Sequence, residues 1–340
     1  MVSLPGLTQD AAQLQERIDR FHAVREGILN QVREVIVGQE EVLEQILIAI
    51  FVGGHCLLTG MPGTAKTLMV RTIADALGLQ FRRIQFTPDL MPSDITGTDI
   101  IEEDVTTGHR KWTFVEGPIF GNILLADEIN RTPPKTQSAL LEAMQEHSCT
   151  VRGHIYQLPA PFFVLATQNP IELEGTYPLP EAQLDRFLFN SILGDLSAED
   201  ELKVIDRTTA TRVTESKAMT SAEDLLEFQQ LVRLVPIADT LARQVVTLVR
   251  STRPKSESAP DFVKKYVNYG ASVRAAQFIV LAAKARALSH KRYHVTYEDI
   301  TALLKPVLRH RILLNFHAES ERIDADEILT RLIAQAPREN

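Results

Sequence analysis

Cysteine is scarce in this sequence. Cys56 and Cys149 are the only two among 340 residues, and they lie far apart in the chain. A metal site or a disulfide framework built on cysteine needs several of them at short, characteristic spacings. The sequence therefore excludes such a framework and predicts two buried or partly buried thiols in a reducing compartment.

Long apolar runs and a leader pattern are also missing. The run 46–58 is interrupted by His55 and is shorter than the roughly 20 apolar residues that span a bilayer. The start, MVSLPGLTQD, lacks the basic residues and apolar stretch of a signal peptide. We therefore expect a cytoplasmic protein without a membrane span.

The sequence has no excess of basic residues, since its formal net charge is −8 and its pI is about 5.7. A surface that binds nucleic acid needs positive charge to neutralise phosphates. The balance argues against nucleic acid as a partner and favours proteins. Hydrophobic residues make up 44% and charged residues 24%, which is typical of a globular chain with a sizeable core.

Helical periodicity marks both ends of the chain. Apolar residues between positions 14 and 35 recur at the spacing of an amphipathic helix, which predicts an N-terminal helical segment over residues 1–35. From 196 to 340 only helical spacing recurs, for example at Leu225, Phe228 and Leu231. We therefore expect a separate all-helical domain over residues 196–340.

Over residues 36–195, five strand-like segments alternate with helical ones. This alternation is typical of an α/β domain with a parallel sheet and helices on both faces. Two inserted hairpins are expected as well, one at about 99–115 with Thr106-Thr107-Gly108 in its turn, and one at 149–158 that turns at Gly153-His154. The expected sheet strands are 55–58, 81–86, 123–126, 162–167 and 187–193.

The segment GMPGTAKT, residues 60–67, lies between an expected strand and an expected helix. Backbone N–H groups at such a turn can surround a phosphate, as in a P-loop. By that pattern Lys66 reaches the β- and γ-phosphates and Thr67 binds Mg²⁺. The strict pattern has glycine before the lysine, and we expect Ala65 there to have ordinary backbone angles. The expected nucleotide contacts are Gly60, Pro62, Gly63, Thr64, Ala65, Lys66, Thr67 and Leu68.

Two adjacent carboxylates, Asp127 and Glu128, follow the expected strand 123–126. Taken alone, the P-loop segment can also be a glycine turn with a chance lysine, and the acidic pair a solvated strand end. Together they match enzymes that hydrolyse nucleotides, in which Asp127 holds Mg²⁺ through water and Glu128 polarises the attacking water. Asn169 is expected to orient that water, although asparagine before proline is also a common turn former.

Two arginines are candidates for contact with the γ-phosphate. Arg186 ends an expected helix, and we expect it to face the γ-phosphate of a neighbouring subunit. A surface ion pair that involves Asp185 and Arg186 or Glu181 is the alternative. Arg274 stands near a helix start, where a cation needs a compensating anion, and we expect it to swing over a bound nucleotide.

With these motifs in this order, most of the chain resembles the MoxR group of AAA+ ATPases, which is related to the magnesium-chelatase branch with a hairpin inserted in its second core helix. The alanine before the P-loop lysine is also a feature of that family. The resemblance implies a P-loop AAA+ core, a helical lid domain, and ATP and Mg²⁺ as cofactors. It rests on FTPDLMPSD (86–94), DEINR (127–131), PPKTQ (133–137), ATQNP (166–170) and DRF (185–187).

The resemblance further implies a hexameric ring that hydrolyses ATP and remodels or activates a protein complex in the manner of a chaperone, with a partner that carries a von Willebrand factor A domain. Val37, Gly38 and Gln39 would lie beside the adenine, and the two hairpins would line or approach the axial opening of the ring. A nucleic-acid motor of the same branch and a scaffold that barely turns over ATP remain alternatives. The hairpins carry both signs of charge, which does not favour a channel that tracks phosphates.

Overall fold

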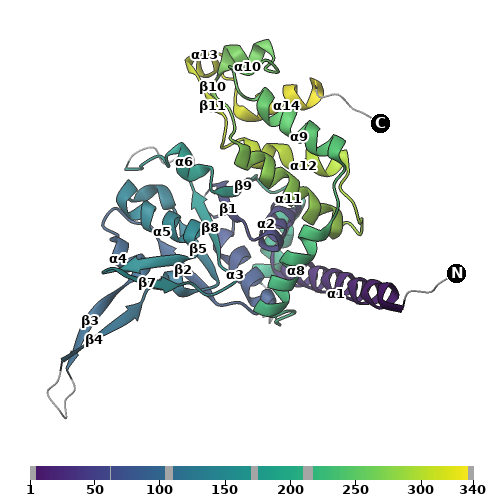
Figure 1. The fold of residues 1–340 in the computed structure, drawn as a ribbon. Helices are drawn as coiled ribbons and strands as arrows, with labels where there is room; N and C mark the ends of the chain where they lie inside the picture. Colours follow the sequence, from purple (N-terminus) through teal and green to yellow (C-terminus); the bar gives the residue numbers. More distant parts are fainter. Residues whose placement is uncertain (1–4, 62, 104–109, 170–174, 210–216, 336–340) are drawn as a thin grey trace.

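The computed structural model describes residues 5–61, 63–103, 110–169, 175–209 and 217–335. Its centre is a five-stranded parallel sheet in the order β2-β5-β8-β1-β9 (Figure 1). All five expected strands are present, and the predicted α/β class is confirmed. The strands are β1 (His55–Gly60), β2 (Phe81–Gln85), β5 (Ile123–Asp127), β8 (Phe163–Gln168) and β9 (Phe187–Leu193).

The parallel arrangement brings the carboxyl ends of the strands to one edge of the sheet. The register places Gln85 of β2 opposite Asp127 of β5, and Leu58 of β1 opposite Thr167 of β8. The segments that follow these positions begin side by side. The P-loop segment, the acidic pair and the end of β8 therefore meet at this edge.

Helices cover both faces of the sheet. Leu125 and Leu165 belong to an apolar cluster with α1, α2 and α3, whereas their neighbours Leu124 and Val164 belong to a second cluster with α4 and α5. Because both faces are buried, the central strands read as continuous apolar runs. The helices of this region are α1 (Pro5–Val35), α2 (Glu40–Val52), α3 (Lys66–Leu77), α4 (Pro92–Thr96), α5 (Pro134–Glu146) and α6 (Glu181–Leu184), with single 3₁₀ turns η1 (Pro118–Phe120) and η2 (Ile129–Arg131).

Two antiparallel hairpins extend from this core, β3 (Gly97–Glu103) with β4 (Arg110–Glu116), and β6 (Ser148–Val151) with β7 (His154–Gln157). The predicted turn residues 106–108 of the first hairpin lie outside the described residues. The predicted turn of the second is wrong by one position, because His154 pairs with Val151 and the turn is Arg152-Gly153. Both turn residues have positive φ, 49° and 85°, as a two-residue hairpin turn requires.

The two hairpins contact each other through aromatic and charged side chains. Phe114 stacks on Tyr156 with ring centroids 4.0 Å apart. The guanidinium of Arg152 lies 4.5 Å from the ring centroid of Trp112 and 3.8 Å from the carboxylate of Asp99. The first hairpin projects away from the rest of the molecule (Figure 1), so these contacts connect its base to the core.

The second domain is helical over its described residues 198–209 and 217–335, except for one pair of strands that the sequence did not predict. Strands β10 (Val267–Tyr269) and β11 (Leu313–Leu314) form a small antiparallel pair. They have three and two residues, too few for an alternating pattern to be recognised. The helices are α7 (Ala198–Thr209), α8 (Ala222–Leu234), α9 (Asp239–Ser251), α10 (Asp261–Tyr266), α11 (Val273–Ser289), α12 (Tyr297–Leu308), α13 (Phe316–Ser320) and α14 (Ala325–Gln335).

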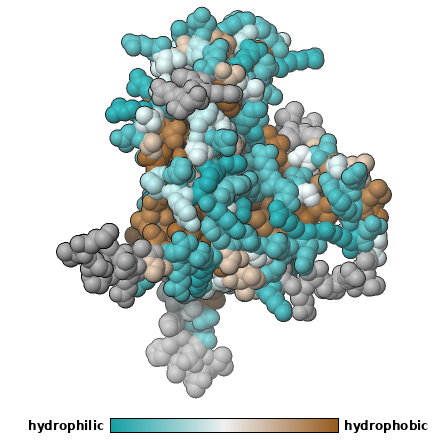
Figure 2. Space-filling view, turned by 90° about the vertical axis from the view of Figure 1, so that its right-hand side faces the viewer, coloured by the Kyte–Doolittle hydropathy of each residue, from teal (hydrophilic) through white to brown (hydrophobic). Residues whose placement is uncertain are grey.

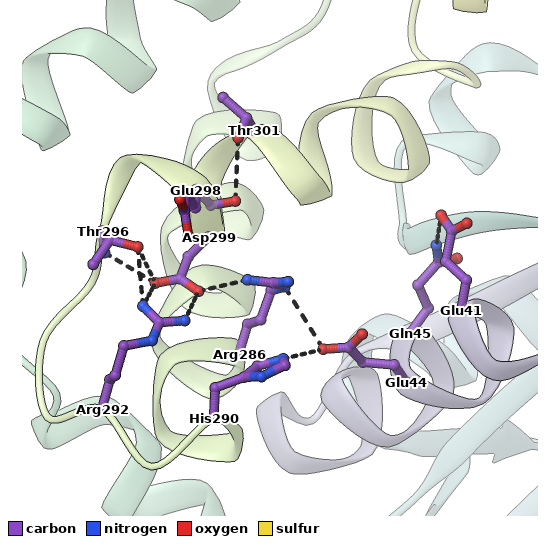
Figure 3. Close-up of polar contacts among 10 residues, drawn as sticks. All are labelled: Glu41, Glu44, Gln45, Arg286, His290, Arg292, Thr296, Glu298, Asp299 and Thr301. Atoms are coloured by element: carbon purple, nitrogen blue, oxygen red, sulfur yellow. Dashed lines mark hydrogen bonds and ion pairs between the residues drawn. The ribbon is translucent and has the colours of Figure 1, made fainter. Parts of the chain in front are cut away.

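Apolar and polar contacts join the two domains. Phe21 of α1 packs against Phe51 of α2 and Phe228 of α8, with ring centroids 4.7 and 5.5 Å away. On α2, Glu44 accepts a hydrogen bond of 2.7 Å from Nε2 of His290 and lies 3.6 Å from Nε of Arg286 (Figure 3). The α/β domain and the helical domain therefore share one apolar cluster with polar contacts beside it.

Asp299 continues these polar contacts within the helical domain, because it also bonds to Arg286. Its side chain is fully buried and accepts hydrogen bonds from Arg286, Arg292 and Thr296 (Figure 3). Burial raises the pKa of Asp299, but the bonds from Arg292 and Thr296 outweigh it and hold that pKa below its ordinary value. A buried charge with this many partners fixes α12 against α11.

Hydrophilic residues cover most of the face in Figure 2, interrupted by separate hydrophobic patches. Among the described residues, no helix is long and apolar enough to cross a membrane. Cys56 and Cys149 are free thiols, and both are buried.

Candidate nucleotide site

A pocket of about 440 Å³ lies at the carboxyl edge of the sheet. Three segments line it: the P-loop with the start of α3, the end of β5, and the end of β8. The predicted residues Lys66, Thr67, Asp127, Glu128 and Asn169 therefore meet in one cavity. The complete lining is Gly63, Thr64, Ala65, Lys66, Thr67, Leu68, Asp127, Glu128, Thr167 and Asn169.

The P-loop backbone differs from the sequence prediction at Ala65. This residue has φ 56° and ψ 24°, in the left-handed region, so the expectation of ordinary angles was wrong. Ala65 is the N-cap of α3, where the chain reverses from the loop into the helix. A non-glycine residue in this conformation costs about 1 kcal/mol. The turn leaves the first N–H groups of α3 without helical partners, which suits them to bind an anion.

Lys66 is held on the loop by backbone carbonyls. Its Nζ donates to the carbonyl oxygens of Gly60 at 2.6 Å and Met61 at 2.9 Å. Burial lowers the pKa of Lys66, and the nearby Asp127 and Glu128 oppose that shift without cancelling it. Gly60 thus contacts the lysine rather than lining the pocket. Pro62, another predicted contact, lies outside the described residues.

Asp127 is anchored on both oxygens. Oδ1 accepts a hydrogen bond of 2.6 Å from the Thr167 hydroxyl, and Oδ2 accepts one of 2.7 Å from Nη2 of Arg83. The Thr167 oxygen also accepts the backbone N–H of Glu128 at 2.8 Å. One hydroxyl at the end of β8 therefore fixes both carboxylate-bearing residues at the end of β5.

Glu128 is turned toward β2. Its Oε2 accepts a hydrogen bond of 2.6 Å from Nε2 of Gln85 and lies 3.2 Å from Nε of Arg131. Its backbone is also left-handed, with φ 56°. Gln85 in turn accepts a bond from Arg83 at 2.7 Å. Arg83 and Gln85 were not predicted, because only the pairing of β2 with β5 brings them to the acidic pair.

A second pocket of about 370 Å³ adjoins the first and shares Gly63, Thr64, Ala65 and Leu68 with it. It extends to Val37 and Gln39, and Nε2 of Gln39 donates to the carbonyl of Gly194 at 2.7 Å. Gly38 has φ 70°, and a Cβ there would meet Leu196 at 3.0 Å. The three predicted adenine contacts thus lie at or beside a pocket that continues from the P-loop.

Arg186 and Arg274 lie away from these two pockets. Nη1 of Arg186 donates to the carbonyl of Leu141 on α5, and the arginine lines a separate pocket of about 290 Å³. Asp185 pairs with Nε of Arg311 at 2.8 Å and with Nη1 of Arg274 at 3.6 Å. Asp185 is therefore the anion that compensates Arg274 near the start of α11.

The matches to known families cover both domains. Residues 55–189 match the family described as ATPase family associated with various cellular activities (AAA), and residues 261–332 match the AAA lid domain. The crystal structure of a Cytophaga hutchinsonii protein is similar to this chain, with a TM-score of 0.88, 40% sequence identity and 98% of both chains covered.

Relatives in other bacteria agree with these matches. The Mycobacterium tuberculosis protein named Chaperone MoxR1 is 42% identical over 312 residues, which cover 92% of this chain and 81% of that protein. The Bacillus subtilis protein YeaC is 42% identical over 315 residues, with 92% and 94% covered. Protein MoxR of Paracoccus denitrificans is 28% identical over 320 residues, with 91% and 94% covered. The chain belongs to the MoxR family of AAA+ ATPases.

Proposed function

We propose that this chain binds ATP with Mg²⁺ in the two adjoining pockets and hydrolyses it to ADP and phosphate. The observation that carries the proposal is the convergence of Lys66, Asp127 and Glu128 in one cavity at the sheet edge. Lys66 neutralises the β- and γ-phosphates, in exchange for its present bonds to the loop carbonyls. Val37 and Gln39 hold the adenine in the second pocket.

The residues fit magnesium. Thr67 offers a hydroxyl oxygen and Asp127 carboxylate oxygens, the hard ligands that Mg²⁺ prefers. Among the described residues, no group of three or more His, Cys, Asp or Glu side chains is placed to hold a metal, so phosphate oxygens and water must complete the coordination. A bound ion would supply positive charge against the phosphates. Asp127 would then exchange its bond with Arg83 for the ion or its water.

Glu128 acts as the base that orients and polarises the attacking water, and Asn169 holds that water from the other side of the pocket. Both side chains line the same cavity as Lys66. Gln85 and Arg131 contact Oε2 of Glu128 and restrain its side chain within that cavity.

Assembly into a ring supplies further positive charge for the γ-phosphate. Arg186 and Arg274 lie outside the pocket of their own chain, and both adjoin Asp185. We infer that they act on the γ-phosphate of a neighbouring copy in a homo-oligomeric, hexameric ring. Such a ring works as a chaperone-like remodeller of protein clients, with a von Willebrand factor A domain partner. A cytoplasmic location stays a prediction of the sequence.

The hairpins support a protein client. Ile101 and Trp112 are cross-strand partners and are 53% and 57% exposed, and Ile155 of the second hairpin is 68% exposed. Exposed apolar surface of this kind marks sites of protein interaction. We propose that the hairpins contact the client.

The test is Glu128→Gln. We expect ATP binding and assembly to persist while phosphate release falls by a factor on the order of 10² or more. Glu257→Gln, an exposed glutamate in the loop between α9 and α10, is the matched control and should leave turnover unchanged. Unchanged turnover in Glu128→Gln would remove Glu128 from its role. Affinity purification of the Glu128→Gln chain with ATP then identifies bound clients.

A further inference from the structure

Arg311 is a buried arginine that connects the lid domain to the end of the nucleotide-binding core. It follows α12, and its side chain is 1% exposed. Its Nε donates to Oδ1 of Asp185 at 2.8 Å, and its guanidinium lies 5.1 Å from the ring centroid of Phe278. Burial lowers the pKa of Arg311 to about 10 against the opposing effect of Asp185, so the guanidinium stays charged at neutral pH.

Nη1 of Arg311 donates to the carbonyl of Val307 on α12, and its other backbone bonds are to the segment around Arg186. Nη2 donates to the backbone carbonyls of Asp185 at 2.9 Å and of Phe187 at 2.5 Å. These are the residues immediately before and after Arg186. Nη1 donates to the carbonyl of Leu188 at 3.3 Å. A planar guanidinium with several fixed donors is suited to hold a backbone segment in one conformation.

The carboxylate of Asp185 also contacts two other residues of the lid domain. Its carboxylate accepts hydrogen bonds of 3.0 and 3.2 Å from the hydroxyl of Ser272, the N-cap of α11, and lies 3.6 Å from Nη1 of Arg274. Arg274 is 39% exposed, whereas Arg311 is almost wholly buried. Arg274 can therefore leave Asp185 at little desolvation cost, while Arg311 keeps the segment in place.

We propose that Arg311 is a positioning residue for Arg186. By fixing the two carbonyls that flank Arg186, it makes the direction of that side chain depend on how the lid is seated on the core. Movement of α12 relative to β9 then moves Arg186 toward or away from the γ-phosphate of the adjacent subunit. This inference rests on the proposed function, in which Arg186 acts across a subunit interface.

The test places the intact pocket and the intact Arg186 on different chains of a mixture. An Arg186→Ala chain has an intact pocket, and a Lys66→Ala chain has an intact arginine, so hydrolysis in a mixture occurs where the first receives Arg186 from the second. We expect Lys66→Ala to restore phosphate release by Arg186→Ala. We expect the chain with both Lys66→Ala and Arg311→Lys to restore at most about one tenth of the phosphate release that Lys66→Ala alone restores. A displacement of a catalytic group by roughly 1 Å can cost 10²-fold in rate.

ATP affinity of the Arg186→Ala chain should be the same in both mixtures, because Arg311→Lys is not on the chain whose pocket is read. The matched control is Arg331→Lys in the Lys66→Ala chain. Arg331 pairs with Glu327 within α14, and this variant should restore release fully. A mixture in which Arg311→Lys also restores release fully would overturn the inference.

Asp185→Asn provides the second variant if Arg311→Lys does not assemble. It keeps the side-chain volume and removes the charge that fixes Arg311, so it should also lower the restored release. Full restoration by Asp185→Asn would contradict the inference in the same way. Failure of Lys66→Ala alone to restore any release refutes instead the proposed action of Arg186 across the interface.

Discussion

Gln85, the last residue of β2, donates a hydrogen bond of 2.6 Å from its Nε2 to Oε2 of Glu128, which directly follows the adjacent strand β5. The candidate catalytic base is thereby restrained by the last residue of β2. The chain after Gln85 passes through α4 directly into β3 of the projecting hairpin.

Gln85→Leu is expected to raise basal ATP hydrolysis. The substitution keeps the size of the side chain and removes the hydrogen bond that Gln85 donates to Glu128, so Oε2 becomes available to polarise water in the pocket. A net hydrogen bond is worth about 1 kcal/mol, so the rise should be on the order of fivefold. Steady-state phosphate release measures it, with the exposed Gln230→Leu on α8 as control. Lower turnover would mean that Gln85 positions Glu128 productively instead of restraining it.

Ala65→Gly is expected to stabilise the protein slightly. Glycine adopts the left-handed angles of this position without the steric cost of about 1 kcal/mol that alanine bears, although its greater freedom in the unfolded chain offsets part of the gain. The same change at Ala74, buried within α3, should destabilise by about 1 kcal/mol or more. Urea unfolding of both variants measures these changes in the free energy of unfolding. A larger loss at position 65 than at 74 would contradict the strain argument.

His55 makes stability depend on pH. Its Nδ1 accepts the N–H of Val164 and its Nε2 donates to the carbonyl of Met144, both at 3.1 Å, so the bonds require a neutral ring. Burial lowers the pKa of His55 to about 4, against a smaller opposing effect of the Met144 carbonyl. In the unfolded chain the pKa is about 6.5.

Between these values the unfolded state binds the proton and the folded state does not, so stability present above about pH 6.5 is lost as the pH falls toward 4. The loss from this residue is at most about 1.4 kcal/mol per pH unit. His55→Asn keeps a donor and an acceptor but cannot titrate. Its free energy of unfolding should vary less between pH 7 and pH 4.5 than that of the parent chain, and equal slopes would exclude His55 as the cause.

Trp112 is the only tryptophan in the chain, so its fluorescence reports on the contact between the hairpins. Arg152 covers one face of its ring. Arg152→Ala should shift the emission to longer wavelength by a few nanometres because water reaches that face, while Arg110→Ala, whose parent side chain pairs with Glu103, should not. An unchanged spectrum in Arg152→Ala would show that the hairpins do not hold this contact in solution.

Local sequence patterns were enough to predict much of the site. The P-loop segment, the acidic pair after an apolar strand and Asn169 after the next one each mark a strand end. A parallel sheet then gathers them at a single edge. Ala65 shows the limit of that reasoning, because its backbone angles follow from the entry into α3 and not from the residue type. The two short strands of the lid were missed for lack of a readable period.

By itself the sequence determined which residues are the candidates for phosphate chemistry, since Lys66, Thr67, Asp127 and Glu128 belong to short motifs that are recognised from neighbours along the chain. Only the tertiary structure decided what restrains them. Gln85 meets Glu128 across two paired strands, and Arg311 meets Asp185 across 126 residues of sequence. Contacts of this kind depend on how helices and strands pack in space, and packing over such separations leaves no periodic trace in the chain.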